Sequence, residues 1–145
     1  MEFSFYQLED SNFLRTICKI IERAYLEGYK IIVKVEDSLI EAELNKILWS
    51  YSQKTFIPHG ASFDPLPKQQ TVYITTQDEN LNDADLVIFV NSFSNDTCQN
   101  YKKILNIFGF HNPNKDSYNA LHKTNLSLGI SSIFYLQHGQ TWQKT

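Results

Sequence analysis

The opening of the chain alternates strand patterns with helix patterns, and this alternation constrains the fold more than any other feature of the sequence. Residues 3–8 and 30–35 have the composition of strands, and the apolar residues between them recur every three or four positions. A second helix pattern begins at Ser38, which forms the S-x-x-E spacing of a capping box with Glu41. Strands separated by helices are too far apart along the chain for hairpins, so we expect them to be parallel.

The rest of the chain continues this pattern after an interruption. Residues 50–70 show no apolar periodicity, which predicts a loop of about twenty residues. Loops of this length inside a compact domain usually have a function. Beyond it the sequence predicts strands at 71–75, 85–90 and 103–108, helices at 94–101 and 115–128, and a closing strand or hairpin at 132–142. With 145 residues the chain has the size of one domain. We therefore expect a single α/β domain over residues 1–145.

The turn after the first strand argues against a nucleotide site. A phosphate-binding turn in this class of fold needs glycines, so that backbone N–H groups can approach the phosphate. Residues 9–12 read Glu-Asp-Ser-Asn, with no glycine and two carboxylates that would repel a phosphate. Cys18 and Cys98 stand far apart, and no metal-ligand spacing accompanies them. We expect no nucleotide, metal or other cofactor.

Composition narrows the class of protein. Hydrophobic residues make up 42% and charged residues 20%, which excludes a disordered chain, and the apolar runs are far too short to span a bilayer. Two cysteines cannot form a disulfide framework, so we expect a cytoplasmic protein. The net charge is −3, yet residues 97–145 carry five lysines and one acidic residue. An acidic chain is a poor ligand for duplex DNA, whereas the basic last third either attracts an acidic partner or reflects chance.

An aromatic segment spans the end of the second predicted helix and the loop that follows it. Trp49 ends the helix pattern, and Phe56 and Pro58 lie in the loop. The rings either fold back onto the core or form an exposed patch of the kind that anchors protein interfaces. His59 follows directly, either as a structural histidine of the turn or as a base.

Several motifs, taken in order, resemble the chi subunit family of bacterial DNA polymerase III, and the resemblance covers essentially the whole chain. Its most specific part is the pairing of Leu48-Trp49 with Phe56-Ile57-Pro58-His59-Gly60. The other matching segments are Phe5-Tyr6-Gln7-Leu8, Ala24-Tyr25-x-x-Gly28-Tyr29-Lys30, the strand 31–35 with Glu36-Asp37, Asp83-Ala84-Asp85 and Tyr135-x-Gln137-x-Gly139-x-x-Trp142.

This resemblance implies a Rossmann-like domain without a nucleotide site, and an adaptor rather than a catalyst. Members of the family link the psi subunit of the clamp loader to the acidic C-terminal tail of single-stranded DNA-binding protein. The psi-facing residues of the family match Trp49 and Phe56, with Pro58 beside them, so we expect psi, or a protein that takes its place, to bind there. We expect a monomer in isolation that reaches DNA only through its partners and contacts no membrane.

The resemblance also implies a tail-binding site on the last helix. There Lys115, Asn119, His122 and Lys123 have the spacing i, i+4, i+7 and i+8, which predicts one shared face. The family usually has an arginine at position 119 and an aromatic residue at 122, so charge recognition would rest on the two lysines. Because an ordinary histidine titrates near 6.5, we expect His122 to strengthen binding as the pH falls toward 6.

Two other functions remain open from the sequence. The chain is alternatively a small α/β enzyme that uses the loop at 50–70, with His59 as its base. It is also a candidate for direct binding of single-stranded DNA through Lys102, Lys103 and Lys123.

Overall fold

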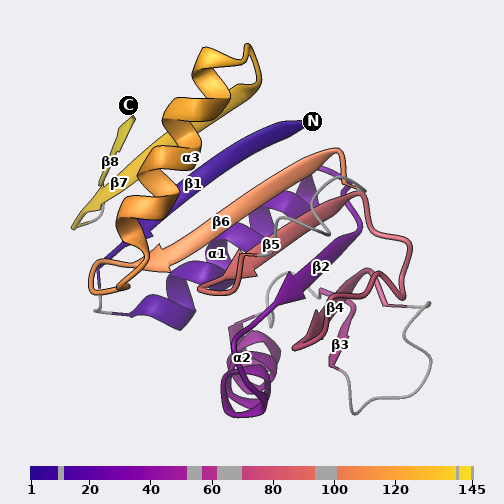
Figure 1. Cartoon of the computed structure of the whole chain (residues 1–145). Helices are drawn as coiled ribbons and strands as arrows, with labels where there is room; N and C mark the ends of the chain where they lie inside the picture. The colour runs from indigo at the N-terminus through magenta and orange to yellow at the C-terminus, as the bar shows by residue number, and fades with distance from the viewer. Residues whose placement is uncertain (10–11, 52–56, 62–69, 94–100, 140, 145) are drawn as a thin grey trace.

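The computed structural model describes residues 1–9, 12–51, 57–61, 70–93, 101–139 and 141–144. Eight strands form one sheet in the order β3-β4-β2-β5-β6-β1-β7-β8 (Figure 1). Every pair of neighbouring strands is parallel except β7 and β8, which are antiparallel. The predicted α/β fold with a mostly parallel sheet is confirmed. The elements are β1 (Glu2–Leu8), α1 (Phe13–Leu26), β2 (Ile31–Lys34), α2 (Ser38–Tyr51), β3 (His59–Ala61), β4 (Val72–Thr75), β5 (Leu86–Val90), β6 (Lys103–Gly109), α3 (Lys115–Ser127), β7 (Ser131–His138) and β8 (Thr141–Lys144).

Helices pack on both faces of the sheet and enclose two cores of different composition. In Figure 1, α3 lies in front of the sheet and α1 behind it. The core beneath α1 and α2 is mainly aliphatic, with Ile17, Ile21, Leu44, Leu48, Val33, Ile88 and Ile107 among its residues. The core beneath α3 is mainly aromatic, with Phe3, Phe5, Phe89, Phe108, Tyr118 and Phe134 among its residues. Each helix in the part of the chain that the structure describes is too short or too polar to span a bilayer.

One predicted helix end agrees with the structure and another differs from it by one residue. Gly28 ends α1 with a φ of 94°, in the left-handed region that favours glycine, as the sequence predicts. At the start of α2, the Asp37 carboxylate accepts a hydrogen bond from the Ile40 N–H at 3.0 Å. Asp37 is therefore the N-cap, and the capping box predicted from Ser38 is wrong by one position.

Two further predictions need comment. The loop predicted over residues 50–70 contains β3, which pairs in parallel with β4 at one edge of the sheet. Three residues, one of them glycine, are too few to show a strand pattern in the sequence.

Most of the short helix predicted at 94–101 lies outside the described residues. Tyr101, its last residue, is in neither a helix nor a strand and is 7% exposed.

Candidate functional site

The first predicted site residue, Trp49, lies on the surface at the end of α2. Leu44 and Leu48 point into the aliphatic core, and the next position along the helix turns outward. Trp49 is 52% exposed, and its ring centroid lies 4.6 Å from that of His59. Pro58, half-buried, precedes His59 in the chain. We call Trp49, Pro58 and His59 the tryptophan surface; Phe56 lies outside the described residues.

His59 supports this surface from within the sheet. It belongs to β3 and is 5% exposed, so the prediction of a turn histidine is wrong. Its Nδ1 lies 2.8 Å from the Ile57 carbonyl oxygen, and since a carbonyl only accepts, Nδ1 carries the proton. The remaining lone pair, on Nε2, is buried and has no hydrogen-bond partner in the described part of the chain. A buried lone pair is a poor position for a general base, which must reach a substrate.

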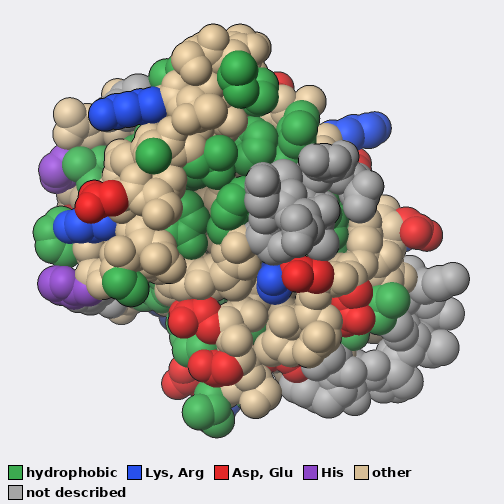
Figure 2. Space-filling model, in the orientation of Figure 1, with side chains coloured by type: hydrophobic (Ala, Val, Ile, Leu, Met, Phe, Trp, Pro, Cys, Tyr) green, Lys and Arg blue, Asp and Glu red, His purple; other side chains and the backbone are tan. Residues whose placement is uncertain are grey.

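The second predicted site lies on α3. Lys123 is exposed, and Lys115 extends its ammonium group to 5.2 Å from the ring centroid of Phe110, which is 49% exposed. The Asn119 Nδ2 donates a hydrogen bond to the Lys115 carbonyl oxygen at 3.0 Å. Figure 2 shows Lys and His side chains along the left edge, beside α3 and β7, with one acidic group between them, and further acidic side chains in the lower part, where α2 lies. We call Phe110, Lys115 and Lys123 the α3 surface.

His122 does not join this surface. It is 7% exposed, its Nδ1 lies 2.7 Å from the Ser132 hydroxyl oxygen, and its ring packs 5.6 Å from Phe5. Tyr118, His122 and Asn125 recur at three- and four-residue steps and form the buried stripe of α3. Burial lowers the pKa of His122, because an imidazolium is poorly solvated there. The predicted shared face of four residues, and a surface role for His122, are therefore wrong.

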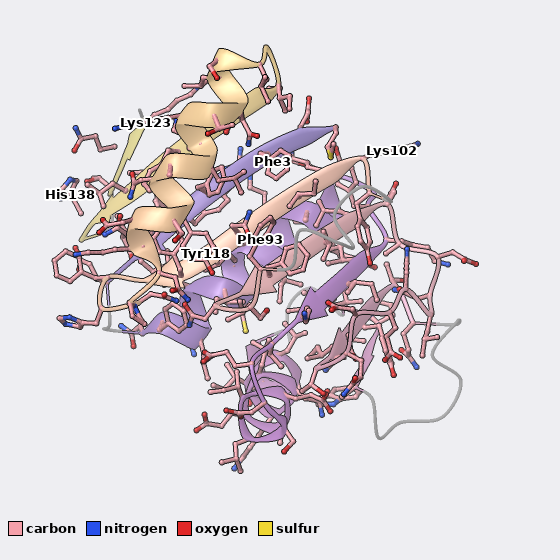
Figure 3. All side chains as sticks on the ribbon, in the orientation of Figure 1. Phe3, Phe93, Lys102, Tyr118, Lys123 and His138 are labelled. Carbon is pink, nitrogen blue, oxygen red and sulfur yellow. The ribbon has the colours of Figure 1, made fainter. Side chains whose placement is uncertain are left out.

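The three lysines considered for direct DNA binding do not form one surface. Lys103 projects on the α1 side, where its ammonium group lies 5.5 Å from the ring centroid of Tyr29. Lys123 belongs to α3, on the other side of the sheet. In Figure 3, Lys102 lies beyond the start of β6, well apart from Lys123.

Sequence reasoning assigned no function to an aromatic cluster on the α1 side of the sheet. Tyr6 and Tyr135 stack with their ring centroids 4.9 Å apart, and Trp142 meets Tyr6 edge-on at 5.6 Å. The sequence did contain a signal for this cluster, because Tyr6 and Tyr135 both lie in predicted strands. What the sequence lacked was the register that pairs these two tyrosines.

No group of three or more His, Cys, Asp or Glu side chains within the described ranges could hold a metal ion. The two candidate surfaces contain ring faces, apolar groups and lysine ammonium groups. Such groups bind peptide segments and carboxylates, and no described arrangement among them joins a nucleophile to a base.

Comparisons with known proteins agree with this fold and extend it to a family. The C-terminal domain of the DEAD-box protein Dbp5 is similar in structure, with a TM-score of 0.54 and 14% sequence identity, covering 92% of this chain and 89% of that one. At so low an identity the likeness shows the fold alone.

A relative in sequence is the probable DNA polymerase III subunit chi of Rickettsia prowazekii (strain Madrid E), 39% identical over 89 residues. The match covers 61% of this chain and 54% of the relative, so the chain spans about half the length of the curated relative it matches. The model of the family "DNA polymerase III chi subunit, HolC" matches residues 1–128. The chain belongs to the chi subunit family of DNA polymerase III, a family of accessory subunits in DNA replication.

Proposed function

We propose that this protein is a non-catalytic adaptor of the replicase, linking the psi subunit of the clamp loader to the acidic C-terminal tail of single-stranded DNA-binding protein. In this proposal the tryptophan surface binds psi and the α3 surface binds the tail. An adaptor needs two partner surfaces that do not overlap. Here one candidate lies at the end of α2 and the other on α3, and these helices pack on opposite faces of the sheet.

The single observation that carries the proposal is the exposed indole of Trp49. Exposed tryptophans are costly to leave in water and are over-represented among the residues that dominate binding energy at interfaces. This indole is also supported, because His59 packs against it and is itself held by the Ile57 carbonyl. A ring held in place before binding loses little conformational freedom when a partner covers it.

The test is the affinity of Trp49→Ala for the psi subunit of the same organism, measured by isothermal titration calorimetry. We expect a loss of about 2 kcal/mol or more, as for a buried anchor residue. Leu39→Ala is the matched control, since Leu39 is a 77% exposed apolar residue on the same helix and lies ten positions before Trp49. It should leave the affinity unchanged.

Two outcomes would contradict the psi assignment. One is an equal loss of affinity in both variants, which would indicate a general effect on α2 rather than an anchor. The other is a Trp49→Ala protein that binds psi normally. A thermal melt of each variant separates both outcomes from unfolding, because truncation of a half-exposed ring should cost little stability.

The α3 surface offers positive charge and an apolar ring, and these groups complement the carboxylates and apolar side chains of an acidic peptide. Lys115 and Lys123 supply positive charge, and Phe110 supplies an apolar ring beside Lys115. Without an arginine at position 119, two flexible ammonium groups would hold the carboxylates, so binding should weaken steeply with salt. Because His122 is buried, it should not strengthen tail binding as the pH falls toward 6.

A further inference from the structure

A groove on the α1 side of the sheet contains both ring faces and positive charge. Its volume is about 280 Å³, close to the lower end of small-ligand pockets, which start near ~300 Å³. One wall is the solvent-facing side of α1, the floor is formed by β1, β6 and β7, and Trp142 of β8 closes the far side. We call this the aromatic groove. It is separate from the tryptophan surface and from the α3 surface.

The rings of the groove form a fixed platform. Tyr6 and Tyr135 are register partners on adjacent parallel strands, and their rings stack with an interplanar angle of 17°. Trp142 stands at 85° to Tyr6, 5.6 Å away, and lies 6.3 Å from Tyr135. Trp142 is nevertheless 40% exposed. Its indole is therefore held from one side and open on another, as a stacking partner for a flat ligand must be.

The charges around the platform favour an anion. Lys19 and Arg23 project from α1 one helical turn apart, and Lys103 extends from β6. Two acidic residues also line the groove, Glu2 and Glu27, and Glu27 lies 3.5 Å from Arg23 in an exposed ion pair of little strength. Cations thus outnumber anions here, within a chain of net charge −3.

Lys144 adds to this positive balance. It lies two residues after Trp142 in β8, so both side chains leave the strand on the same face. Lys144 is also the register partner of Tyr135. The exposed indole therefore shares its face of β8 with one ammonium group, that of Lys144, and shares the groove with the cations of α1.

We propose that the aromatic groove binds single-stranded DNA directly, with a base stacked on Trp142 and the backbone phosphates against Lys19 and Arg23. Aromatic faces lined by cations are the recurrent means of holding single strands without regard to sequence, because every base has a π-face. The membership of the chain in a replicative polymerase family supplies the ligand. This goes beyond the adaptor role, in which DNA is reached only through another protein.

An acidic peptide is the competing ligand, and the observations favour DNA over it. A peptide carboxylate would use the cations and its apolar side chains could contact the rings, but a nucleobase is the flat group that stacks on the open face of Trp142.

The experiment is a fluorescence-anisotropy titration of the full chain against a labelled oligo(dT) of about 16 nucleotides, at the upper end of single-strand site sizes, over a series of salt concentrations. In parallel, Trp49→Phe leaves Trp142 as the one tryptophan of the chain. Its emission should be quenched by unlabelled oligo(dT), because a stacked base quenches an indole. A labelled acidic peptide without aromatic residues provides the competing arm.

We expect Trp142→Ala to weaken oligo(dT) binding about tenfold, the loss of one base–aromatic stack, and Trp142→Tyr to restore most of it. Arg23→Gln should weaken binding at low salt and reduce the salt slope by about 1. Lys123→Ala, on the other side of the sheet, and Trp49→Ala should leave DNA binding unchanged. The Trp49→Ala control also separates this proposal from the adaptor proposal, which fails or stands on psi binding.

Three results would overturn the proposal. The first is no binding of oligo(dT) at low salt. The second is that Trp142→Ala and Arg23→Gln both bind oligo(dT) as tightly as the unchanged protein. The third is that the acidic peptide binds more tightly than oligo(dT) and that the same variants weaken its binding. If Trp142→Ala disturbs the β7–β8 hairpin, the decision rests on Arg23→Gln and Lys19→Gln. Both are exposed helix positions whose substitution leaves the core intact.

Discussion

Asn106 carries a primary amide into the aromatic core beneath α3. It lies on β6 between its register partners Phe5 and Phe89 and is fully buried. Neither its Oδ1 nor its Nδ2 has a hydrogen-bond partner among the residues that the structure describes. An unpaired buried amide costs free energy, whereas an apolar side chain of similar shape costs none. We expect Asn106→Leu to raise the free energy of unfolding by about 1 kcal/mol, measured by urea denaturation.

The matched control is Asn82, which is equally buried but whose Nδ2 is hydrogen-bonded. Its Nδ2 donates to the Gln70 carbonyl oxygen at 2.9 Å and to the Ile31 carbonyl oxygen at 3.1 Å. Asn82→Leu should therefore destabilise the protein, the opposite sign for the same chemical change. Destabilisation by both substitutions would mean that Asn106 is satisfied by buried water rather than unpaired.

His122 makes stability depend on pH. Because burial lowers its pKa, the folded protein favours the neutral ring, while the unfolded chain protonates near 6.5. Below that pH the unfolded state binds more protons, so the free energy of unfolding falls as the pH falls. Above about pH 7 this contribution is complete and constant.

The check is the difference in unfolding free energy between the unchanged protein and His122→Gln, measured from pH 7.5 to 5. Glutamine does not titrate and retains the capacity to hydrogen-bond Ser132. The difference should shrink as the pH falls, because only the protein with histidine loses this contribution. Parallel pH profiles would show that the ring titrates normally.

At the scale of elements, the cap of α2 gives a clear test of helix-start chemistry. The Asp37 carboxylate accepts from the Ile40 N–H, and its carbonyl accepts from the Glu41 N–H at 3.1 Å. Asp37→Ala should cost about 1 kcal/mol of stability in thermal or urea unfolding. Ser38→Ala should be nearly neutral, since Ser38 is the first residue inside the helix. The reverse order of costs would restore Ser38 as the cap.

How well the elements could be predicted depended on their length. The helix at 13–26 repeats an apolar period, and the strands at 86–90 and 103–109 are mainly apolar runs, so all three can be found from sequence. β3 has only three residues and no period, so tertiary pairing alone reveals it. Asp and Ser are both favourable N-cap residues, so the sequence does not decide whether Asp37 or Ser38 caps α2.

The site could be predicted only in part, for a similar reason. Trp49 was identified as a candidate, but whether its ring was core or surface depended on where β3 lies beneath it. His122 was assigned to the surface because its spacing matches that of Lys115 and Lys123. A helix face wide enough to hold all four predicted residues borders the buried stripe of α3. Which residues fall on the buried side depends on how α3 packs against β7 and β1.

On the scale of the whole molecule, the sheet separates the two proposed partner surfaces. α2 packs against β3 and β4 near one edge, and α3 packs against β7 and β1 near the other, on the opposite face. A partner covering Trp49 therefore has no steric reason to exclude a peptide on α3. Mutational effects at sites more than about 7–10 Å apart that share no partners usually add to within about 0.3–0.5 kcal/mol.

This separation predicts that both partners bind at once and independently. Calorimetric titration of psi should give the same affinity whether or not the acidic tail peptide of single-stranded DNA-binding protein is present at saturation. Trp49→Ala should weaken psi alone, Lys123→Ala should weaken the peptide alone, and the double variant should show both losses without further change. Competition between the two partners would place them on one surface and end the adaptor proposal. Mutual strengthening would instead require a change in the sheet that couples α2 to α3, because linkage makes any such effect reciprocal.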